Sequence, residues 1–218
     1  ITIYISLELT TLPLVALAAF RRDSHSAEAG VKFLILSAIS SAVLLYGMVI
    51  LYGFTGTTML PDIAQQLTGR GFNPEMAFGS PALLFSVVLI IAGFGFKIAS
   101  VPFQMWAPDV YEGSPTPVTA FLSVASKAAG FAVILRVFYI AFSADILIVE
   151  WSAIFAILSV FSMTFGNLVA IRQDNIKRLL AYSTVAHAGY LMVGLATIVT
   201  RIPEGHASVG PTGVLFYL

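Results

Sequence analysis

The stretch PALLFSVVLIIAGFGFKIASVPF, residues 81–103, decides the fold class of this chain. About twenty consecutive, mostly apolar residues are enough to cross the hydrocarbon core of a membrane as a helix. The run carries one charged residue, Lys97, which stands five positions before Pro102. Proline interrupts a helix because it removes a backbone donor and clashes with the preceding turn. The stretch therefore predicts a membrane-spanning helix that breaks close to a lysine.

The composition of the whole chain indicates a polytopic helical membrane protein. Charged residues make up 10% of the 218 residues and hydrophobic residues 58%, whereas a soluble domain carries about 25% charged residues. The eleven basic and eleven acidic residues cancel, and the sequence has no basic patch, which argues against a nucleic-acid partner. The chain has no cysteine, which excludes disulfides, iron–sulfur clusters and cysteine-ligated zinc. Its three histidines lack metal-ligand spacing, and no glycine-rich phosphate loop indicates a nucleotide site.

Six apolar segments and part of a seventh have the length of membrane helices or of their beginnings. They lie at 1–20, 31–55, 81–102, 115–141, 149–170 and 179–200, followed by 209–218. The long polar connector at 56–75 contains PDIAQQL, which predicts a short interfacial helix. Both ends of the chain are apolar, so we expect it to be a piece of a longer protein. The segments predict an all-α transmembrane bundle with a broken helix near Lys97–Pro102.

The basic residues at the helix ends predict the orientation, because cytoplasmic loops are enriched in lysine and arginine. Alternate connectors belong to the same side of the membrane. The first, third and fifth connectors and their flanks hold Arg21, Arg22, Lys32, Arg172, Lys177 and Arg178. The opposite side holds Arg70, Arg136 and Arg201. We therefore expect the first group in the cytoplasm or its equivalent, with Lys32 as a snorkelling lysine at a helix mouth.

Four titratable residues fall inside the apolar segments, namely Glu8, Lys97, Lys127 and His187. A charge at the membrane centre costs at least about 2.5–3.5 kcal/mol, so these residues need an explanation. One explanation is a structural ion pair between Glu8 and Lys97, which leaves Lys127 unpaired. The other is a proton relay, in which Glu8 changes the proton affinity of Lys97 and Lys127 takes the proton onward. His187 either hydrogen-bonds to a neighbouring helix or joins the relay.

The segment SVPFQMWAPDVYEGSPTP, residues 100–117, carries four prolines. Backbone groups that proline frees inside a membrane must be buried in protein or must line water. Trp106 and Tyr111 are residue types that suit a membrane interface, whereas Asp109 and Glu112 are acidic on an otherwise basic side. The segment is either a tight re-entrant turn with interfacial aromatics or a hinge that admits water.

Three separated motifs resemble the antiporter-like membrane subunits of complex I. They are LELTTLPLVALAAF at 7–20, FKIASVPFQMWAPDVYEGSPTPVTAFLSVASKAAGFAVILRVF at 96–138 and RQDNIKRLLAYSTVAHAGYLMVGL at 172–195. The motifs occur in the order of the family, and the resemblance covers nearly the whole chain. Within the family, PDVYEGSPTPVTAFLSVASK is similar to the N type of bacterial complex I and to its counterpart in photosynthetic relatives. Gln104 departs from the pattern, because relatives often carry histidine there.

The resemblance implies a fourteen-helix fold with two inverted five-helix repeats, of which residues 1–218 would be one transmembrane domain covering about helices five to eleven. It implies proton transfer by Glu8, Lys97, Lys127 and His187. The complex would be a proton-translocating NADH:quinone oxidoreductase, and this chain would catalyse nothing by itself and would bind no cofactor. NAD, FMN, iron–sulfur clusters and quinone would bind elsewhere in the complex. The implied partners are the lipid bilayer and membrane subunits of the L, M, K, J, A and H types.

Other functions stay open at this point. A free-standing cation/proton antiporter would share the fold, and a structural scaffold would use the charges only to lock helices together. A ferredoxin:plastoquinone version of the complex is a further alternative. The expected location is the bacterial plasma membrane, with a thylakoid or mitochondrial inner membrane as the alternatives.

Overall fold

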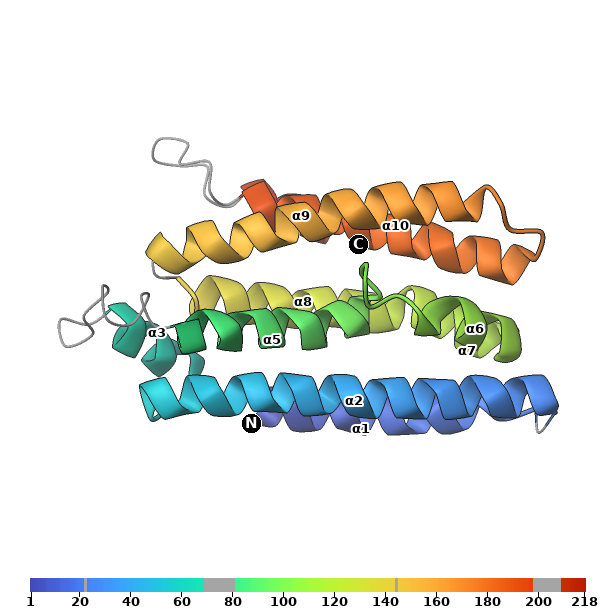
Figure 1. Cartoon of the computed structure of the whole chain (residues 1–218), viewed down its shortest axis with the longest axis horizontal. Helices are drawn as coiled ribbons and strands as arrows, with labels where there is room; N and C mark the ends of the chain where they lie inside the picture. The colour runs from blue at the N-terminus through green and yellow to red at the C-terminus, as the bar shows by residue number, and fades with distance from the viewer. Residues whose placement is uncertain (22, 69–80, 144, 198–208) are drawn as a thin grey trace.

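The computed structural model describes residues 1–21, 23–68, 81–143, 145–197 and 209–218, which form helices joined by turns (Figure 1). In chain order the helices are α1 (Thr2–Ala18), α2 (Ser24–Thr55), α3 (Leu60–Thr68), α5 (Pro81–Ile98), α6 (Trp106–Gly113), α7 (Thr116–Ser123), α8 (Ala125–Ile140), α9 (Asp145–Ala170), α10 (Ile176–Ala196) and α11 (Val209–Tyr217). Five spans in the described residues are long and apolar enough to cross a membrane, and they lie in α2, α5, α7 with α8, α9 and α10. Helix α1 is apolar but shorter, with 17 residues.

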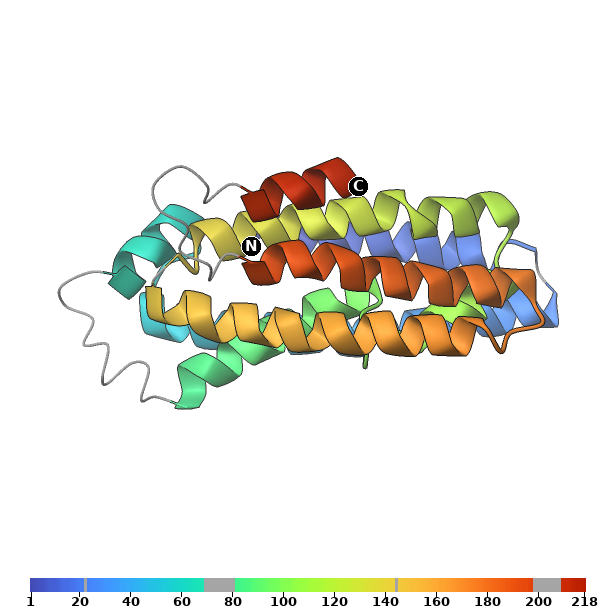
Figure 2. The ribbon, with the colours of Figure 1, turned by 90° about the horizontal axis from the view of Figure 1, so that it is seen from above.

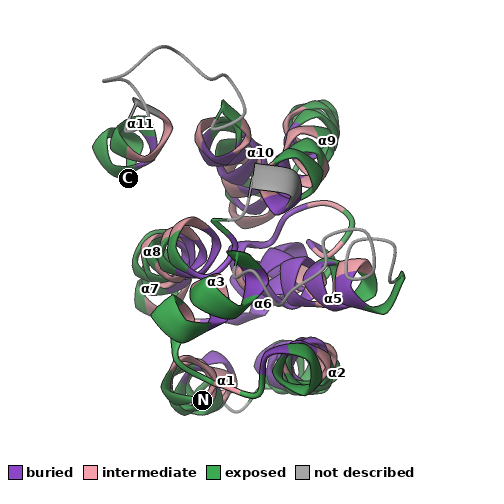
Figure 3. Ribbon diagram, turned by 90° about the vertical axis from the view of Figure 1, so that its left-hand side faces the viewer, coloured by how far each residue is buried: buried purple, intermediate pink, exposed green. Residues whose placement is uncertain are grey.

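The helices pack in three layers, which Figure 3 shows end-on. Helices α1 and α2 form one outer layer, and α9, α10 and α11 form the other. The middle layer holds α5 to α8, with α3 at one end of the bundle (Figure 1). In α5, Leu83, Ile90 and Phe94 are almost completely buried. The outer helices expose many apolar side chains, which suits contact with lipid.

Two capping residues explain why helices begin earlier than the apolar segments predicted. Helix α2 begins at Ser24 because Asp23 accepts a hydrogen bond of 2.7 Å from the amide of Ser26. Helix α10 begins at Ile176 because Asn175 accepts one of 2.9 Å from the amide of Lys177. Such caps satisfy amides that the first turn leaves without a partner. The short helix predicted within the connector at 56–75 is confirmed as α3.

The predicted single helix over 115–141 is divided at Val124, between α7 and α8. The hydroxyl of Ser123 donates 2.8 Å to the carbonyl of Ala120, which also accepts from the amide of Val124 at 3.3 Å. A serine that bonds back to its own helix competes with the backbone ladder and bends the helix. The ladder resumes where the amide of Ala128 donates 2.9 Å to the carbonyl of Val124. This second break carries no proline, so the sequence analysis missed it.

Small residues bring α9 and α10 into close contact along the bundle (Figure 2). A Cβ atom added at Gly166 would lie 2.7 Å from the amide nitrogen of Ala186, and one added at Gly189 would lie 2.8 Å from that of Met163. The hydroxyl of Ser159 donates 2.8 Å to the carbonyl of Gly189. Close backbone approach and interhelical hydrogen bonds are the usual means of joining helices within a membrane. The two helices therefore form a tightly spaced pair.

Candidate functional site

The predicted break beside Lys97 is confirmed. Helix α5 ends at Ile98, which places Lys97 in its last turn. Ala99 then adopts a φ of 56°, and the Val101–Pro102 peptide bond is cis. The last carbonyl groups of a helix carry a partial negative charge, which favours a cation in that turn. The break thus places a lysine at a helix C-terminus within the middle layer.

The backbone groups freed at the break find partners inside the protein. The indole Nε1 of Trp106 donates 2.9 Å to the carbonyl of Phe96, and the amide of Val101 donates 2.9 Å to the hydroxyl of Ser162 on α9. Trp106 and Tyr111, predicted at a membrane interface, are enclosed by protein, since the two residues are 2% and 0% exposed. Trp106 is buried because its indole covers the end of α5. The break is therefore enclosed by protein, as irregular backbone at membrane depth requires.

Lys97 lies in a polar cluster formed with α1 and α2. Its Nζ atom donates to the hydroxyl of Thr11 and lies 4.0 Å from an Oε1 atom of Glu8. The same Oε1 atom accepts a hydrogen bond from the hydroxyl of Ser41 on α2. Glu8 and Thr11 stand three positions apart on α1 and so share one face of that helix. The structure brings the predicted residues Glu8 and Lys97 together and adds Thr11 and Ser41, which the sequence analysis did not single out.

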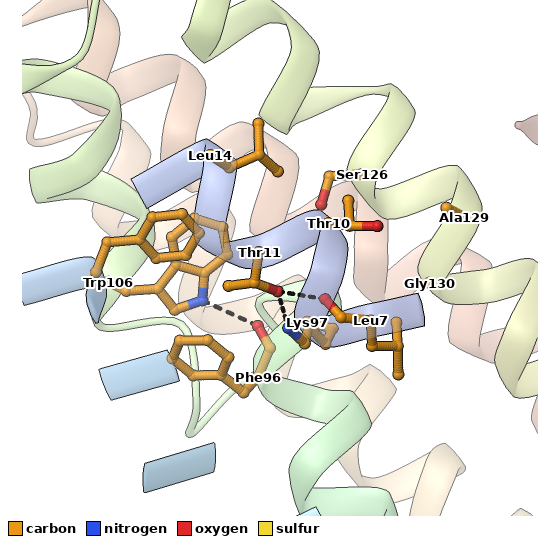
Figure 4. A pocket seen from close by; sticks show the side chains of 11 residues that line it. Leu7, Thr10, Thr11, Leu14, Phe96, Lys97, Trp106, Ser126, Ala129 and Gly130 are labelled. Atoms are coloured by element: carbon orange, nitrogen blue, oxygen red, sulfur yellow. Dashed lines mark hydrogen bonds between the residues drawn. The ribbon is translucent and has the colours of Figure 1, made fainter. Parts of the chain in front are cut away.

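A cavity of about 50 Å³ borders Lys97 between α1, α5 and α8 (Figure 4). Hydroxyl-bearing residues line it, namely Thr10 and Thr11 from α1 and Ser126 from α8. A buried water needs roughly 10–15 Å³ of such space and 2–4 polar partners. The cavity is large enough for water, and although most of its lining is apolar, the three hydroxyl groups and Lys97 are polar partners there. It also reaches α8 at the residue before Lys127.

Lys127 points toward α10, where its Nζ atom donates 2.7 Å to the carbonyl of Thr184. Lys127 is 5% exposed and lies in the first turn of α8, directly after the break at Val124. A first turn carries a partial positive charge and so disfavours a cation. Within the described residues, no ion pair joins Lys127 to a carboxylate. The dipole of α5 therefore favours a positive charge on Lys97, whereas the dipole of α8 opposes one on Lys127.

His187 lies apart from the cluster around Lys97, on the side of α10 that meets α11. Its Nδ1 atom is 2.6 Å from the hydroxyl of Tyr217 on α11. Thr184 stands three positions earlier on α10, one turn away on the same side. Among the described residues, histidine and carboxylate side chains form no group of three that would hold a metal ion. Of the predicted site residues, the structure brings Glu8 and Lys97 together, whereas Lys127 and His187 contact other groups, the carbonyl of Thr184 and the hydroxyl of Tyr217.

Acidic residues of α6 pair with basic residues from both outer layers. Asp109 accepts hydrogen bonds of 2.8 Å from Lys32 on α2 and from Arg178 on α10, and Glu112 accepts one of 2.9 Å from Arg178. Burial raises the pKa of Asp109, but the hydrogen bonds from Lys32 and Arg178 outweigh burial and hold the pKa below its usual value. Lys32, predicted to snorkel at a helix mouth, also pairs with Glu28 at 2.7 Å, and its position relative to a membrane stays a prediction. The acidic residues on the basic side thus have partners.

The same contacts gather the first, third and fifth connectors at one end of the bundle (Figure 1). Lys177 lies within electrostatic reach of Arg21 and donates 2.7 Å to the carbonyl of Ser114. The grouping of these connectors agrees with the predicted topology, whereas their side of the membrane stays a prediction. Three residues used in that prediction lie outside the described residues, namely Arg22, Arg70 and Arg201.

Comparison with known proteins gives consistent matches along the chain. Residues 1–205 match the family model described as NADH:quinone oxidoreductase/Mrp antiporter, transmembrane. The chain is 49% identical over 218 residues to the NADH-quinone oxidoreductase subunit N of Desulforamulus reducens. It is 51% identical over 222 residues to the protein of the same name from Heliobacterium modesticaldum. Each alignment covers 100% of this chain and 42% of the relative.

A solved structure has the same fold. A chain in the structure of respiratory complex I from Thermus thermophilus with bound aureothin matches at a TM-score of 0.74 and 36% identity. The match covers 98% of this chain and 42% of that chain, so this chain spans less than half the length of these relatives. The predicted all-α transmembrane bundle is confirmed. From the match over residues 1–205 and these identities, the chain belongs to the NADH:quinone oxidoreductase/Mrp antiporter family of multi-pass membrane proteins.

Proposed function

We propose that this chain is part of a proton-translocating membrane subunit in a complex of the NADH:quinone oxidoreductase type. The proton-carrying residues would be Glu8, Lys97, Lys127 and His187. The observation that carries the proposal is the position of Lys97, whose Nζ atom lies 4.0 Å from the Glu8 carboxylate and beside a cavity large enough for water. A lysine with a carboxylate partner and a water supply exchanges its proton when the partner moves. The name of the relatives supports the assignment to the complex.

The first transfer step depends on the distance between Glu8 and Lys97. At about 4 Å, two opposite charges attract by on the order of 4 kcal/mol at an effective dielectric constant of 20. That attraction favours the ammonium form of Lys97 over the neutral amine. If Glu8 turns further toward Ser41, which already donates to it, the attraction weakens and Lys97 gives its proton to cavity water. Quinone reduction elsewhere would supply the energy by changing a charge or contact at Glu8.

The later steps lead from α8 to α10. Neutral Lys127 accepts the proton and holds it by donating to the carbonyl of Thr184. The first turn of α8 opposes this charge, so Lys127 holds the proton transiently and passes it on. His187 lies one turn further along α10, and its imidazole nitrogens can both accept and donate a proton. It would receive the proton next and pass it toward the part of the subunit that this chain does not cover.

Lysine substitutions in the full-length subunit, assembled in its complex, test the proposal. We expect Lys97→Met and Lys127→Met each to lower the number of protons pumped per electron, because methionine fills the space but carries no proton. Lys97→Arg is the matched control, since arginine keeps the positive charge and does not deprotonate in proteins. A relay requires Lys97→Arg to fail as well, whereas a structural ion pair with Glu8 predicts that it works.

Two results would contradict the proposal. The first is normal pumping by assembled complexes that carry either methionine variant. The second is normal pumping by Lys97→Arg together with loss of assembly in Lys97→Met, which would leave Glu8–Lys97 a structural pair. Reconstitution separates the remaining alternative, because a free-standing antiporter exchanges cations and protons in liposomes by itself. A complex subunit instead co-purifies with a large membrane assembly.

The setting of the chain follows from the same proposal. It would correspond to about helices five to eleven of a fourteen-helix subunit, which agrees with the 42% of the relatives' length that it covers. Its partners would be other membrane subunits, of the L, M, K, J, A and H types, in a bacterial plasma membrane. NAD, FMN, iron–sulfur clusters and quinone would bind elsewhere in the complex. The bacterial sources of the relatives support this location.

A further inference from the structure

The two lysines lie in separate polar environments. Lys97 borders the cavity between α1, α5 and α8, whereas the Nζ atom of Lys127 is directed at α10. Within the described residues, no hydrogen bond or ion pair joins Lys97 to Lys127. A proton that moves between them therefore needs at least one further group. This inference rests on the proposed function, because it concerns the link between the two lysines.

Tyr111 of α6 contacts one residue of each environment. Its ring packs edge-on against that of Trp106, with 6.2 Å between the ring centroids. Trp106 lines the Lys97 cavity and donates to the carbonyl of Phe96, the residue before Lys97 (Figure 4). On its other side, the hydroxyl of Tyr111 lies beside the side chain of Thr184. Thr184 is the residue whose carbonyl accepts from Lys127.

Two polar groups in this region have unused hydrogen-bonding capacity. Tyr111 is fully buried, and among the described residues its hydroxyl has no partner in good hydrogen-bond geometry. A buried polar group without a partner costs about 1–3 kcal/mol, and proteins usually supply protein groups or ordered water. The ammonium of Lys127 offers three donors, of which the carbonyl of Thr184 takes one. A single water between them would serve both groups.

We propose that a bound water joins the hydroxyl of Tyr111 to the Nζ atom of Lys127, and that Tyr111 relays protons between the break and Lys127. A second water, which carries the proton released by Lys97, gives it to the phenol oxygen as the phenol releases its own proton to the bound water. The water in turn gives a proton to the neutral amine of Lys127. Tyrosine and water end the step as they began it, and one positive charge has moved to Lys127.

Removing single hydroxyl groups in the intact complex tests the relay. Tyr111→Phe keeps the ring against Trp106 and deletes the hydroxyl, and we expect proton transfer to slow by about 100-fold, the lower end of what a positioned acid–base group contributes. Thr184→Val deletes the neighbouring hydroxyl but keeps the carbonyl that holds Lys127, and should slow transfer too. The double variant should slow proton transfer no more than the slower of the two single variants, because both changes interrupt the same link. The readouts are protons pumped per electron and the solvent deuterium isotope effect.

Tyr139→Phe is the matched control. Its hydroxyl is also buried and without a partner among the described residues, but its ring packs against Trp151 with 5.9 Å between centroids, near the other end of α8. We expect wild-type pumping from this variant. A density map of the complex that resolves waters should show one within hydrogen-bond distance of the Tyr111 hydroxyl.

Three results would overturn the inference. They are pumping by Tyr111→Phe equal to that of Tyr139→Phe, loss of assembled complex with unchanged protons per electron, and a map without a water at the Tyr111 hydroxyl. The lysine variants separate this inference from the function on which it rests. If Lys97→Met and Lys127→Met stop pumping while Tyr111→Phe does not, only the relay through Tyr111 fails. If both lysine variants pump normally, the proposed function fails.

Discussion

Lys97 and Lys127 obtain different partners inside the bundle, and the difference bears on what each can do. Lys97 donates to the hydroxyl of Thr11 and lies 4.0 Å from the carboxylate of Glu8, which also accepts a hydrogen bond from Ser41. Lys127 donates to a backbone carbonyl, which has a fixed dipole and cannot change its charge. A carboxylate can move or take up a proton, so the charge on Lys97 is open to switching. In the proposed relay, Lys127 would be the group that receives the proton.

The partner of Lys97 gives a prediction at the residue scale. Thr11→Val keeps the shape of the side chain and removes the hydroxyl that accepts from Lys97. Hydrogen bonds to charged groups contribute about 1.5–3 kcal/mol, so the free energy of unfolding of the detergent-purified, full-length subunit should fall by about that amount. Thr10→Val is the control, because its hydroxyl bonds back to Ser6 within α1 and is exposed. Equal losses in the two variants would show that the Thr11 hydroxyl does not stabilise Lys97.

At the scale of helices, the pair formed by α9 and α10 reaches both helix breaks. Ser162 on α9 accepts from the amide of Val101 in the first break. Thr184 on α10 accepts from Lys127, just after the second break. The distance between these two contacts depends on how closely α9 and α10 pack. Gly166 has no side chain, which lets the backbone of α10 approach α9 closely. Its substitution should therefore change the contacts near both lysines, although Gly166 touches neither.

Adding one methyl group to that contact tests the spacing. In Gly166→Ala the new Cβ atom would lie 2.7 Å from the backbone nitrogen of Ala186, so the helices must move apart. Overpacking of this kind costs about 1–3 kcal/mol, which thermal unfolding of the purified subunit would measure. Gly53→Ala on α2 meets nothing within 4 Å and should instead stabilise the helix by about 0.5–1 kcal/mol. A Gly166→Ala protein as stable as Gly53→Ala would contradict the close contact.

At the scale of the whole molecule, ion pairs hold the middle layer to both outer layers. Asp109 of α6 bonds to Lys32 from one outer layer and to Arg178 from the other. Helix α6 also carries Trp106, which covers the end of α5, and Tyr111, which reaches α10. The three layers thus meet at the end of the bundle that holds the first, third and fifth connectors. The position of α6 depends on all three layers.

This arrangement predicts a pH dependence. The folded-state pKa of Asp109 is lowered, so the pair contributes fully above the ordinary aspartate value of 3.8 and is lost as pH falls through the lower folded value. Asp109→Asn should therefore destabilise the subunit near neutral pH, by about 1 kcal/mol. The gap in unfolding free energy between the unsubstituted subunit and Asp109→Asn should close as the pH drops below 3.8. Thermal unfolding as a function of pH measures the gap, and a gap that persists at the lowest pH would contradict the charge-based explanation.

The residue pattern along the chain was enough to predict the membrane class, the approximate helix positions and the break after Lys97. These features depend on local properties, because about twenty apolar residues suffice for a span and Pro102 cannot donate the backbone hydrogen bond that would continue the helix through it. Glu8, Lys97 and Lys127 were found for the same reason, since a charge in an apolar segment is visible without knowledge of its neighbours.

The contacts that each of these groups makes depend on the tertiary structure. The partner of Lys127 on α10, the burial of Trp106 and Tyr111, and the bonds of Asp109 to two outer layers all depend on how helices are rotated and spaced. That geometry comes from contacts between residues far apart in the chain, such as Gly166 with Ala186. Hydropathy and proline positions carry no information about such contacts, because they describe one segment at a time.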